Sequence, residues 1–275
     1  MVLEKFNLIN EIVIITGGAG LLGQRYTKAL LECGATVILF DINSESLKKV
    51  KKKYKKTYKK NFFSYNVDIT REKKILKVKK KIFEKIGRYP TILINNAGID
   101  PKFEKNSKIN KSRLENFDLT QWNLEISVGL TGAMLCSKIF GTEMANSNKG
   151  VILNVSSDLG VIAPDQRLYK QSDLKDEEQS VKPVTYSVIK HALIGLTKYT
   201  ATYWAHKGVR CNAFAPGGVF NNHPDEFYEK LISLIPMQRM ARIDEYEATI
   251  LFLCSDASSY MNGATLNMDG GRSIW

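Results

Sequence analysis

The sequence predicts an α/β fold, a doubly wound parallel sheet with helices on both faces, in a single domain over residues 1–275. Three observations predict it. Short apolar, β-branched runs alternate with longer segments of helical periodicity. The first run leads through a glycine-rich turn into a helix-compatible segment, and no internal repeat or linker-like composition divides the chain. Such alternation favours right-handed crossovers between parallel strands.

The first unit is a strand, a glycine turn and a helix. Ile12–Ile15 is an unbroken β-branched run, which suits a strand buried on both faces. Three glycines follow at three-residue spacing, Gly17, Gly20 and Gly23, and a helix is expected over residues 24–33. This order aims backbone N–H groups and a helix N-terminus at a phosphate. The unit therefore predicts a dinucleotide site.

The remaining elements follow in the same alternation. We expect strands at residues 36–40, 61–67, 91–95, 150–155, 209–214 and 264–268. We expect helices at residues 44–58, 71–86, 119–145, 184–206 and 242–253. The loops after the strands should carry the chemistry, because the carboxyl ends of parallel strands meet at one edge of the sheet.

Two loops look added to a minimal scaffold, and a third is expected to contact the substrate. Residues 101–113 are polar and irregular, and residues 163–183 form a charged insertion. Residues 217–236 form an expected substrate loop with a polar start that includes Asn221, Asn222, His223 and Asp225. Long loops at this edge are often lids or binding loops. Solvated surface loops without substrate contact are the alternative.

The net charge of +12 is concentrated in one region. Residues 48–85 hold 17 of the 40 basic residues and 3 of the 28 acidic ones. Their apolar positions repeat at helical spacing, so the lysines are expected on solvated outer faces of two helices. We therefore expect no nucleic-acid partner; binding of a polyanion or a membrane surface is the alternative, and it would be abolished by salt.

The four cysteines are widely spaced and contain no Cys-x-x-Cys pair, so neither a metal site nor a disulfide framework is expected. The longest apolar runs fall far short of the ~20 residues of a membrane span. His223 has no partner at ligand spacing. These features predict a cytoplasmic protein with reduced thiols, no metal and no membrane partner.

A candidate catalytic group lies in the second half of the chain. Tyr186 and Lys190 are four residues apart on an expected helix, so their side chains share one face. An ammonium beside a phenol favours the phenolate and would lower the tyrosine pKa toward a range useful for proton transfer. Ser156 and Ser157 follow the strand at 150–155, where a hydroxyl could hold the reacting oxygen.

Taken together, these motifs resemble the short-chain dehydrogenase/reductase family over nearly the whole chain. The resemblance rests on Thr16–Gly23, Asp41, Asp68-Ile69, Asn95–Gly98, Asn154–Ser157, Tyr186–Lys190, Val209–Gly217 and Met268–Gly271. It implies a Rossmann-type fold and hydride transfer between a nicotinamide and a carbon bearing a hydroxyl or keto oxygen. Tyr186 would be the general acid/base, Lys190 would bind the nicotinamide ribose, and Ser157, the second serine of its pair, would orient the substrate oxygen.

The resemblance also implies which residues bind the cofactor. Asp68 and Ile69 would border the adenine, Asn95 and Gly98 the middle of the cofactor, and Pro216, Gly217 and Val219 the nicotinamide side. Gly17, Gly20, Leu21, Leu22, Gly23, Asp41, Ile42, Ala97, Tyr186 and Lys190 complete the expected set.

Asp41 bears on the choice of cofactor. A carboxylate at this position accepts hydrogen bonds from a ribose diol and repels a 2′-phosphate. No basic side chain lies at residues 18–22 or 42–43 to offset it. The sequence therefore predicts NAD(H) over NADP(H).

Two departures from the family pattern mark a divergent member. The glycine spacing is similar to that of the longer, sugar-nucleotide-handling branch, although the rest resembles the compact branch. Gly129 stands where the family tetrad has an asparagine that helps to hold a relay water, and leaves space for an extra water or a neighbouring side chain.

The substrate is expected to be a sugar or sugar-nucleotide precursor. The polar loops favour a hydroxyl-rich compound, and Gly129 with the insertion resembles oxidoreductases of flagellin and surface-glycan modification. A ketoreductase of acyl or other small carbonyl compounds is one alternative, and a nucleotide-binding regulatory or scaffold protein is another. The resemblance also implies a homo-oligomer, a dimer or a tetramer.

Overall fold

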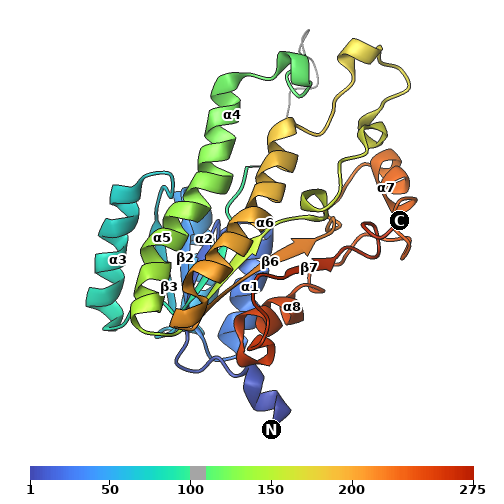
Figure 1. The fold of residues 1–275 in the computed structure, drawn as a ribbon. Coiled ribbons are helices and arrows are strands. Elements are labelled where there is room, and N and C mark those ends of the chain that lie inside the picture. The colour runs from blue at the N-terminus through green and yellow to red at the C-terminus, as the bar shows by residue number, and fades with distance from the viewer. Residues whose placement is uncertain (100–109) are drawn as a thin grey trace.

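A computed structural model describes residues 1–99 and 110–275 (Figure 1). Its centre is one sheet of seven parallel strands in the order β3-β2-β1-β4-β5-β6-β7. The strands are β1 (Ile12–Thr16), β2 (Thr36–Asp41), β3 (Phe62–Asn66), β4 (Ile92–Asn95), β5 (Gly150–Val155), β6 (Val209–Pro216) and β7 (Thr265–Met268). The strand order reverses between β1 and β4, which is where a doubly wound sheet opens a ligand crevice. The predicted fold class is confirmed.

The part of the chain that the structure describes contains eight α-helices. They are α1 (Leu21–Glu32), α2 (Ser44–Lys55), α3 (Glu72–Ile86), α4 (Leu119–Ile126), α5 (Gly132–Asn146), α6 (Val184–Trp204), α7 (Asp225–Ile232) and α8 (Glu247–Cys254). Helices α1, α2 and α8 pack on one face, and α3, α5 and α6 pack on the other (Figure 1).

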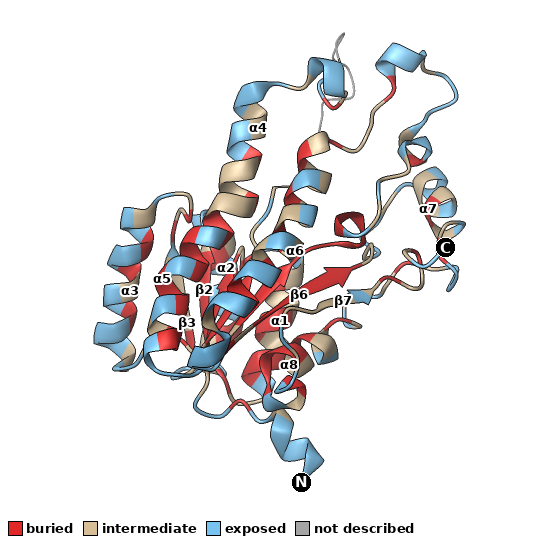
Figure 2. Ribbon diagram, in the orientation of Figure 1, coloured by how far each residue is buried: buried red, intermediate tan, exposed pale blue. Residues whose placement is uncertain are grey.

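The alternation of β1 shows why a β-branched run suits this position. Val13 and Ile15 point into the core under α1, α2 and α8, whereas Ile12 and Ile14 point into the core under α3, α5 and α6. All four side chains are almost fully buried, and Figure 2 shows buried residues along the central strands of the sheet. Burial on both faces rewards a continuous apolar run.

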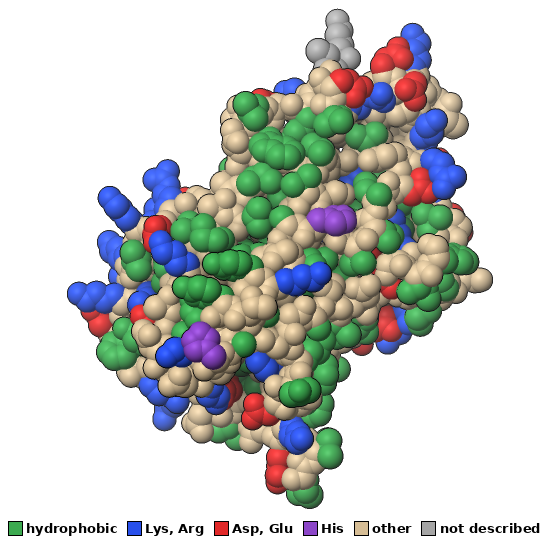
Figure 3. Space-filling model, in the orientation of Figure 1, with side chains coloured by type: hydrophobic (Ala, Val, Ile, Leu, Met, Phe, Trp, Pro, Cys, Tyr) green, Lys and Arg blue, Asp and Glu red, His purple; other side chains and the backbone are tan. Residues whose placement is uncertain are grey.

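The lysine-rich helices have the amphipathic form that the sequence predicts. Leu47, Val50 and Tyr54 of α2 are buried, as are Ile75, Val78 and Ile82 of α3. The lysines between them lie on the outer faces, and Figure 3 shows basic side chains along the edge of the molecule over α3.

The helix predicted at residues 119–145 is not a uniform α-helix. A π-helical turn, Ser127–Thr131, separates α4 from α5. The whole stretch Leu119–Asn146 is long and apolar enough to cross a membrane by length and composition alone. Phe140 and Met144 of α5 are buried against the sheet, so the fold uses these apolar side chains as core.

The long loops contain short regular segments. The expected substrate loop includes a helix, α7, and the insertion at residues 163–183 holds two 3₁₀ turns, Gln166–Tyr169 and Asp176–Glu178. Helix α8 begins five residues later than predicted, because Arg242 belongs to a turn held by Glu245. Of the expected loop at 101–113, residues 101–109 lie outside the described residues.

Candidate active site

A cleft of about 600 Å³ opens at the carboxyl edge of the sheet, above the reversal between β1 and β4. Twelve of the expected cofactor residues line it: Gly17, Gly20, Leu21, Leu22, Asp41, Ile42, Asp68, Ile69, Ala97, Gly98, Tyr186 and Lys190. The crevice rule for open α/β sheets and the sequence motifs therefore indicate the same place.

The glycine turn packs against the segment after β4 so closely that Gly17 cannot carry a side chain. Gly17 has a φ of +61°, and a Cβ there would lie 2.9 Å from the Cα of Ala97. Gly20 caps α1 without a side-chain hydrogen bond, so the first N–H groups of the helix face the cleft. The cradle fits the pyrophosphate of a dinucleotide.

Gly23 and Asn95 do not line this cleft. A Cβ on Gly23 would lie 2.6 Å from the carbonyl oxygen of Gly17, so Gly23 lets the helix pack closely on the turn. The Asn95 amide is buried and donates to Ser137 and Asn154, which ties β4 to α5 and β5. The structure thus places both residues behind the cleft wall.

The acidic residues of the cleft also organise its loops. Asp41 accepts from the backbone N–H groups of Ala19, at 3.0 Å, and Asn43, at 2.9 Å. The hydroxyl of Thr70 donates to Asp68 at 2.6 Å, and this hydrogen bond holds the pKa of Asp68 below its usual range. Both carboxylates are therefore fixed before a ligand binds.

Asn96 was not among the predicted cofactor residues. Its side chain donates to the carbonyl groups of Thr16 and Gly17, which locks β1 to the turn after β4. It lines the cleft and also the smaller pocket described next. The Asn95-Asn96 pair marks this turn as a cofactor-binding segment. The sequence pattern does not show which of the two asparagines faces the cleft.

A smaller pocket of about 280 Å³ adjoins the cleft, and it contains the candidate catalytic residues. Ser157, Tyr186 and Lys190 line it together with Pro216, Gly217 and Val219. Tyr186 and Lys190 line both hollows. The structure therefore brings the predicted acid/base pair to the border between them.

Helix α6 and β5 fix the geometry of this group. The Lys190 ammonium donates to the Val155 carbonyl at 2.8 Å and lies 5.6 Å from the centroid of the Tyr186 ring. The Ser156 hydroxyl donates to the Lys190 carbonyl at 2.7 Å, which joins the strand end to the helix. Ser156 thus has a structural contact with α6.

Ser157 belongs instead to a buried polar network. Its hydroxyl lies 2.6 Å from one oxygen of Asp158, whose other oxygen lies 2.7 Å from an Arg272 nitrogen. Asp158 is 3% exposed and Arg272 is 8% exposed. Neither residue was predicted for the site, since they are 114 positions apart in the chain.

The far wall of the smaller pocket is apolar. Leu168 from the insertion, Phe227 and Leu231 from the substrate loop, and Met240, which follows that loop, form an apolar cluster there. His223 stacks on Phe227 with ring centroids 5.5 Å apart. The polar residues at the start of the loop predict a polar pocket surface, but this wall is apolar. The reason is that the helical spacing of α7 turns its apolar face toward the pocket.

Lys182 adds a second cation near the candidate tyrosine. Its ammonium lies 3.9 Å from the centroid of the Tyr186 ring, within cation–π distance. Lys182 comes from the insertion, so this segment reaches the pocket wall. The sequence pattern of the charged loop gave no sign of which lysine does so.

Gly129 is packed rather than open. A Cβ there would lie 2.8 Å from Cγ2 of Ile189, so the space expected at this position is occupied by a neighbouring side chain. The residue lies in the π-helical turn that lines the cleft. Ile189 precedes Lys190 on α6, and a side chain at residue 129 would displace it.

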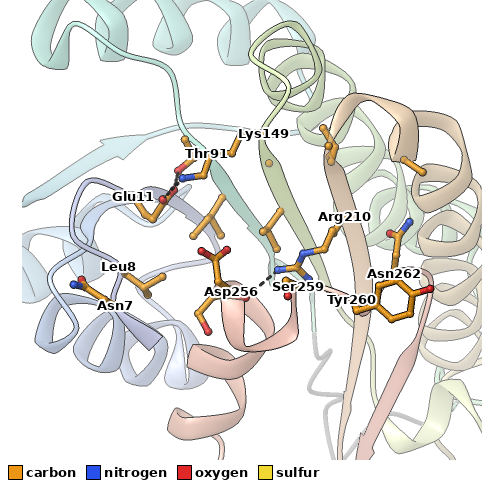
Figure 4. A pocket seen from close by; sticks show the side chains of 18 residues that line it. Asn7, Leu8, Glu11, Thr91, Lys149, Arg210, Asp256, Ser259, Tyr260 and Asn262 are labelled. Carbon is orange, nitrogen blue, oxygen red and sulfur yellow. Dashed lines mark hydrogen bonds and ion pairs between the residues drawn. The ribbon is translucent and has the colours of Figure 1, made fainter. Parts of the chain in front are cut away.

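A third hollow, of about 540 Å³, lies at the opposite, amino edge of the sheet (Figure 4). Its two basic side chains are engaged: Lys149 pairs with Glu11, and Arg210 donates to the carbonyl groups of Ser255 and Met261. The lining lacks the tyrosine–lysine pair and the glycine turn. We therefore assign the chemistry to the carboxyl edge.

Comparison with known proteins shows the family of the chain. Residues 19–273 match the family model described as enoyl-(acyl carrier protein) reductase. The chain is 31% identical to an uncharacterized oxidoreductase of Thermotoga maritima, over 96% of this chain and 98% of that one. It is 29% identical to the 2-dehydro-3-deoxy-D-gluconate 5-dehydrogenase of Bacillus subtilis, over 98% and 96%.

Solved structures agree with these matches. A short-chain dehydrogenase of Leptospira borgpetersenii with bound NAD⁺ superposes with a TM-score of 0.81 at 30% identity, covering 98% of this chain and 94% of that one. A gluconate 5-dehydrogenase of Burkholderia cenocepacia, in complex with NADP and tartrate, has the same fold, with a TM-score of 0.85 at 23% identity over 100% of both chains. The chain therefore belongs to the short-chain dehydrogenase/reductase family of oxidoreductases, which act on hydroxyl and keto groups.

Proposed function

We propose that this enzyme transfers a hydride between NAD(H) and a hydroxyl or keto carbon of a sugar or sugar-derived polyhydroxy compound. One observation carries the proposal. Tyr186 and Lys190 line both the large cleft and the smaller pocket, so a proton donor lies where a cofactor in one and a substrate in the other would meet. Hydride and proton transfer to one carbonyl group require this proximity.

We assign a role to each residue of the pocket. Tyr186 takes the proton from the substrate hydroxyl or returns it to the ketone. Lys190 is oriented by the Val155 carbonyl and would hold the nicotinamide ribose. Ser157 contacts the substrate oxygen. The nicotinamide, when bound, supplies the hydride acceptor or donor.

NAD(H) is proposed as the cofactor because of Asp41. Its carboxylate is fixed in the cleft by two backbone N–H groups, and each oxygen retains a lone pair for a ribose hydroxyl. A 2′-phosphate would meet this fixed negative charge. Related proteins include an NAD-dependent glycerol dehydrogenase of Listeria innocua, 29% identical, as well as a structure with NADP, so the choice rests on Asp41.

The substrate class is proposed from the relatives. They include the 2-dehydro-3-deoxy-D-gluconate 5-dehydrogenase of Bacillus subtilis and a galactitol 2-dehydrogenase of Rhizobium johnstonii that is 29% identical. Use of the product in flagellin or surface-glycan modification is a narrower form of the proposal that rests on the sequence resemblance alone. A ketoreductase is the second candidate, since a 3-oxoacyl-[acyl-carrier-protein] reductase of Thermotoga maritima is 30% identical and the pocket has an apolar wall.

We further propose a cytoplasmic homo-oligomer. Met134, Val188, Tyr199 and Tyr203 are exposed on α5 and α6, and a second copy would bury them. Figure 3 shows hydrophobic side chains on the face that these helices form. Sizing by light scattering tests this, and a monomer at micromolar concentration would contradict it.

A hydride-transfer assay tests the function. Polyols, sugar acids and nucleotide sugars are offered with NAD⁺, and their keto forms and acyl ketones with NADH, while absorbance at the NADH band is followed. We expect turnover with polyhydroxy compounds and higher catalytic efficiency with NAD(H) than with NADP(H). Turnover of acyl ketones alone would favour the second candidate, and equal efficiency with NADP(H) would overturn the cofactor assignment.

A further inference from the structure

The network beside Ser157 joins the candidate active site to the end of the described chain. One oxygen of Asp158 lies 2.6 Å from the Ser157 hydroxyl and 2.8 Å from the Leu159 backbone nitrogen. Its other oxygen lies 2.7 Å from Arg272. All three side chains, Ser157, Asp158 and Arg272, line the smaller pocket.

The contacts determine where the serine proton lies. A carboxylate paired with a guanidinium is ionised and can only accept hydrogen bonds. The hydrogen between Ser157 and Asp158 is therefore the serine's own. The Leu159 N–H lies 3.2 Å from the same hydroxyl oxygen, so the hydroxyl is held in one orientation with a lone pair left for the pocket.

The conformation of the C-terminal turn places Arg272 beside Asp158. Asp269 accepts from the backbone N–H groups of Gly271 and Ser273, each at 3.0 Å. Gly270 and Gly271 have φ values of +69° and +91°, a conformation that favours glycine. Gly217 approaches the same turn so closely that a Cβ would lie 2.8 Å from the Cα of Asp269.

A buried ion pair is a costly way to fill space, because desolvation offsets much of its attraction and apolar side chains often replace it without loss. This pair lies on the pocket wall and has a hydrogen bond to the residue proposed to contact the substrate oxygen. We propose that Asp158 and Arg272 are positioning residues, which orient the Ser157 hydroxyl for hydride transfer. This inference rests on the proposed role of Ser157.

A double-mutant cycle tests the inference. Ser157→Ala, Asp158→Asn and the double variant are compared with the native enzyme in kcat at saturating NAD⁺ and substrate. We expect Asp158→Asn to lower kcat about 10-fold or more, and to have no further effect in the Ser157→Ala background, because neighbours acting through one group are not additive. Losses that multiply would overturn the inference. Native kcat in Ser157→Ala alone would instead overturn the proposed role of Ser157.

Two further variants distinguish a loss of positioning from misfolding. Asp158→Glu keeps the charge beside Arg272 but moves the carboxylate relative to Ser157, and the cycle is repeated with it. The variant Asp158→Asn/Arg272→Gln removes both charges and leaves no unpaired buried ion. NAD⁺ binding, measured by quenching of protein fluorescence, should be unchanged in every variant, whereas a merely structural role would weaken it together with kcat.

A matched control is the half-buried pair of Glu143 and Lys79, which joins α5 to α3 away from both hollows. Glu143→Gln also removes a carboxylate from an ion pair. We expect it to lower thermal stability slightly and to leave kcat within 2-fold of the native value. A loss of kcat equal to that of Asp158→Asn would show that breaking any such pair is sufficient.

Discussion

The two halves of the site are built in different ways. Most residues that line the cofactor cleft lie at the ends of β1, β2, β3 and β4 or in the turns directly after them, and the others come from α4, the π-helical turn and α6. The substrate pocket is lined by distant segments, which include the end of β5, the insertion, α6, the end of β6 with its loop, α7 and the C-terminal turn. The cleft is therefore a product of local sequence, and the pocket is a product of the tertiary fold.

Because of this difference, the two halves should differ in the substitutions that they tolerate. A cradle of backbone groups changes little when surrounding side chains vary, provided that its glycines remain. A pocket assembled from remote side chains changes whenever one segment changes. Four variants test this division, beginning with a change of Tyr186, which is one of the residues that line both halves.

Tyr186→Phe should have the largest effect. The variant keeps the ring and removes the proton-transferring hydroxyl, so we expect kcat to fall about 10²- to 10⁴-fold. Binding of NAD⁺, measured by fluorescence, should be unchanged because the cleft is otherwise intact. Native turnover in this variant would refute the mechanism, and loss of NAD⁺ binding would show that the halves are not separable at Tyr186.

Asp41→Asn should affect the cofactor half alone. The amide keeps the size of the side chain but loses the charge, and a hydrogen bond to a charged group contributes about 1.5–3 kcal/mol. We expect kcat/KM for NAD⁺ to fall about 10- to 100-fold and the preference over NADP⁺ to shrink. Steady-state kinetics with both cofactors measure this. Glu45→Gln, an exposed change at the start of α2, is the control.

Gly129→Ala tests the packing of the cleft wall. The added methyl group would meet Ile189, and overpacking of this kind costs about 1–3 kcal/mol. Chemical unfolding measures the free energy of unfolding. Gly195→Ala on α6 is the matched control, because a Cβ there meets nothing within 4 Å. We expect that variant to be more stable by about 0.5–1 kcal/mol, and equal effects of the two changes would contradict the packing described here.

The smallest effect concerns the ion pair of Arg239 and Glu245 beside the substrate loop. The Arg239 side chain donates to Glu245 and lowers the pKa of that carboxyl to about 2. A depressed pKa contributes stability above the unfolded pKa and loses it as the pH falls toward the folded pKa. Glu245→Gln should therefore be less stable at pH 6, and the difference should shrink between pH 4.5 and pH 2. A constant difference across this range would show that the charge is not responsible.

The sequence was sufficient for the elements whose signal is local. The β-branched run of β1, the glycines and Asp41 predict the cleft because each acts within about thirty residues of the next. Tyr186 and Lys190 could be placed together because a helix fixes residues four apart on one face. The family resemblance then supplied their roles.

The remaining features depend on contacts that no local pattern encodes. The contact of Asp158 with Arg272 joins the end of β5 to the turn after β7, so it depends on the pairing of β5, β6 and β7. The polar residues of the substrate loop predict a solvated polar surface. Helix α7 instead directs Phe227 and Leu231 toward an apolar cluster. Asn95 and Asn96 are neighbours in the sequence, but the end of β4 directs one into the core and the other to the cleft.

The cleft wall depends on the number of residues in the π-helical turn between α4 and α5. Each residue of an α-helix turns the chain by about 100°, so deleting one residue from Ser127–Thr131 would rotate α4 by about that angle relative to α5. Because α5 is anchored to the sheet through Phe140 and Met144, α4 would be the part that turns. Leu124 and Val128 would then leave the cleft wall, although no residue lining the cleft had been substituted. A single-codon deletion here would therefore be more harmful than most substitutions in the same stretch.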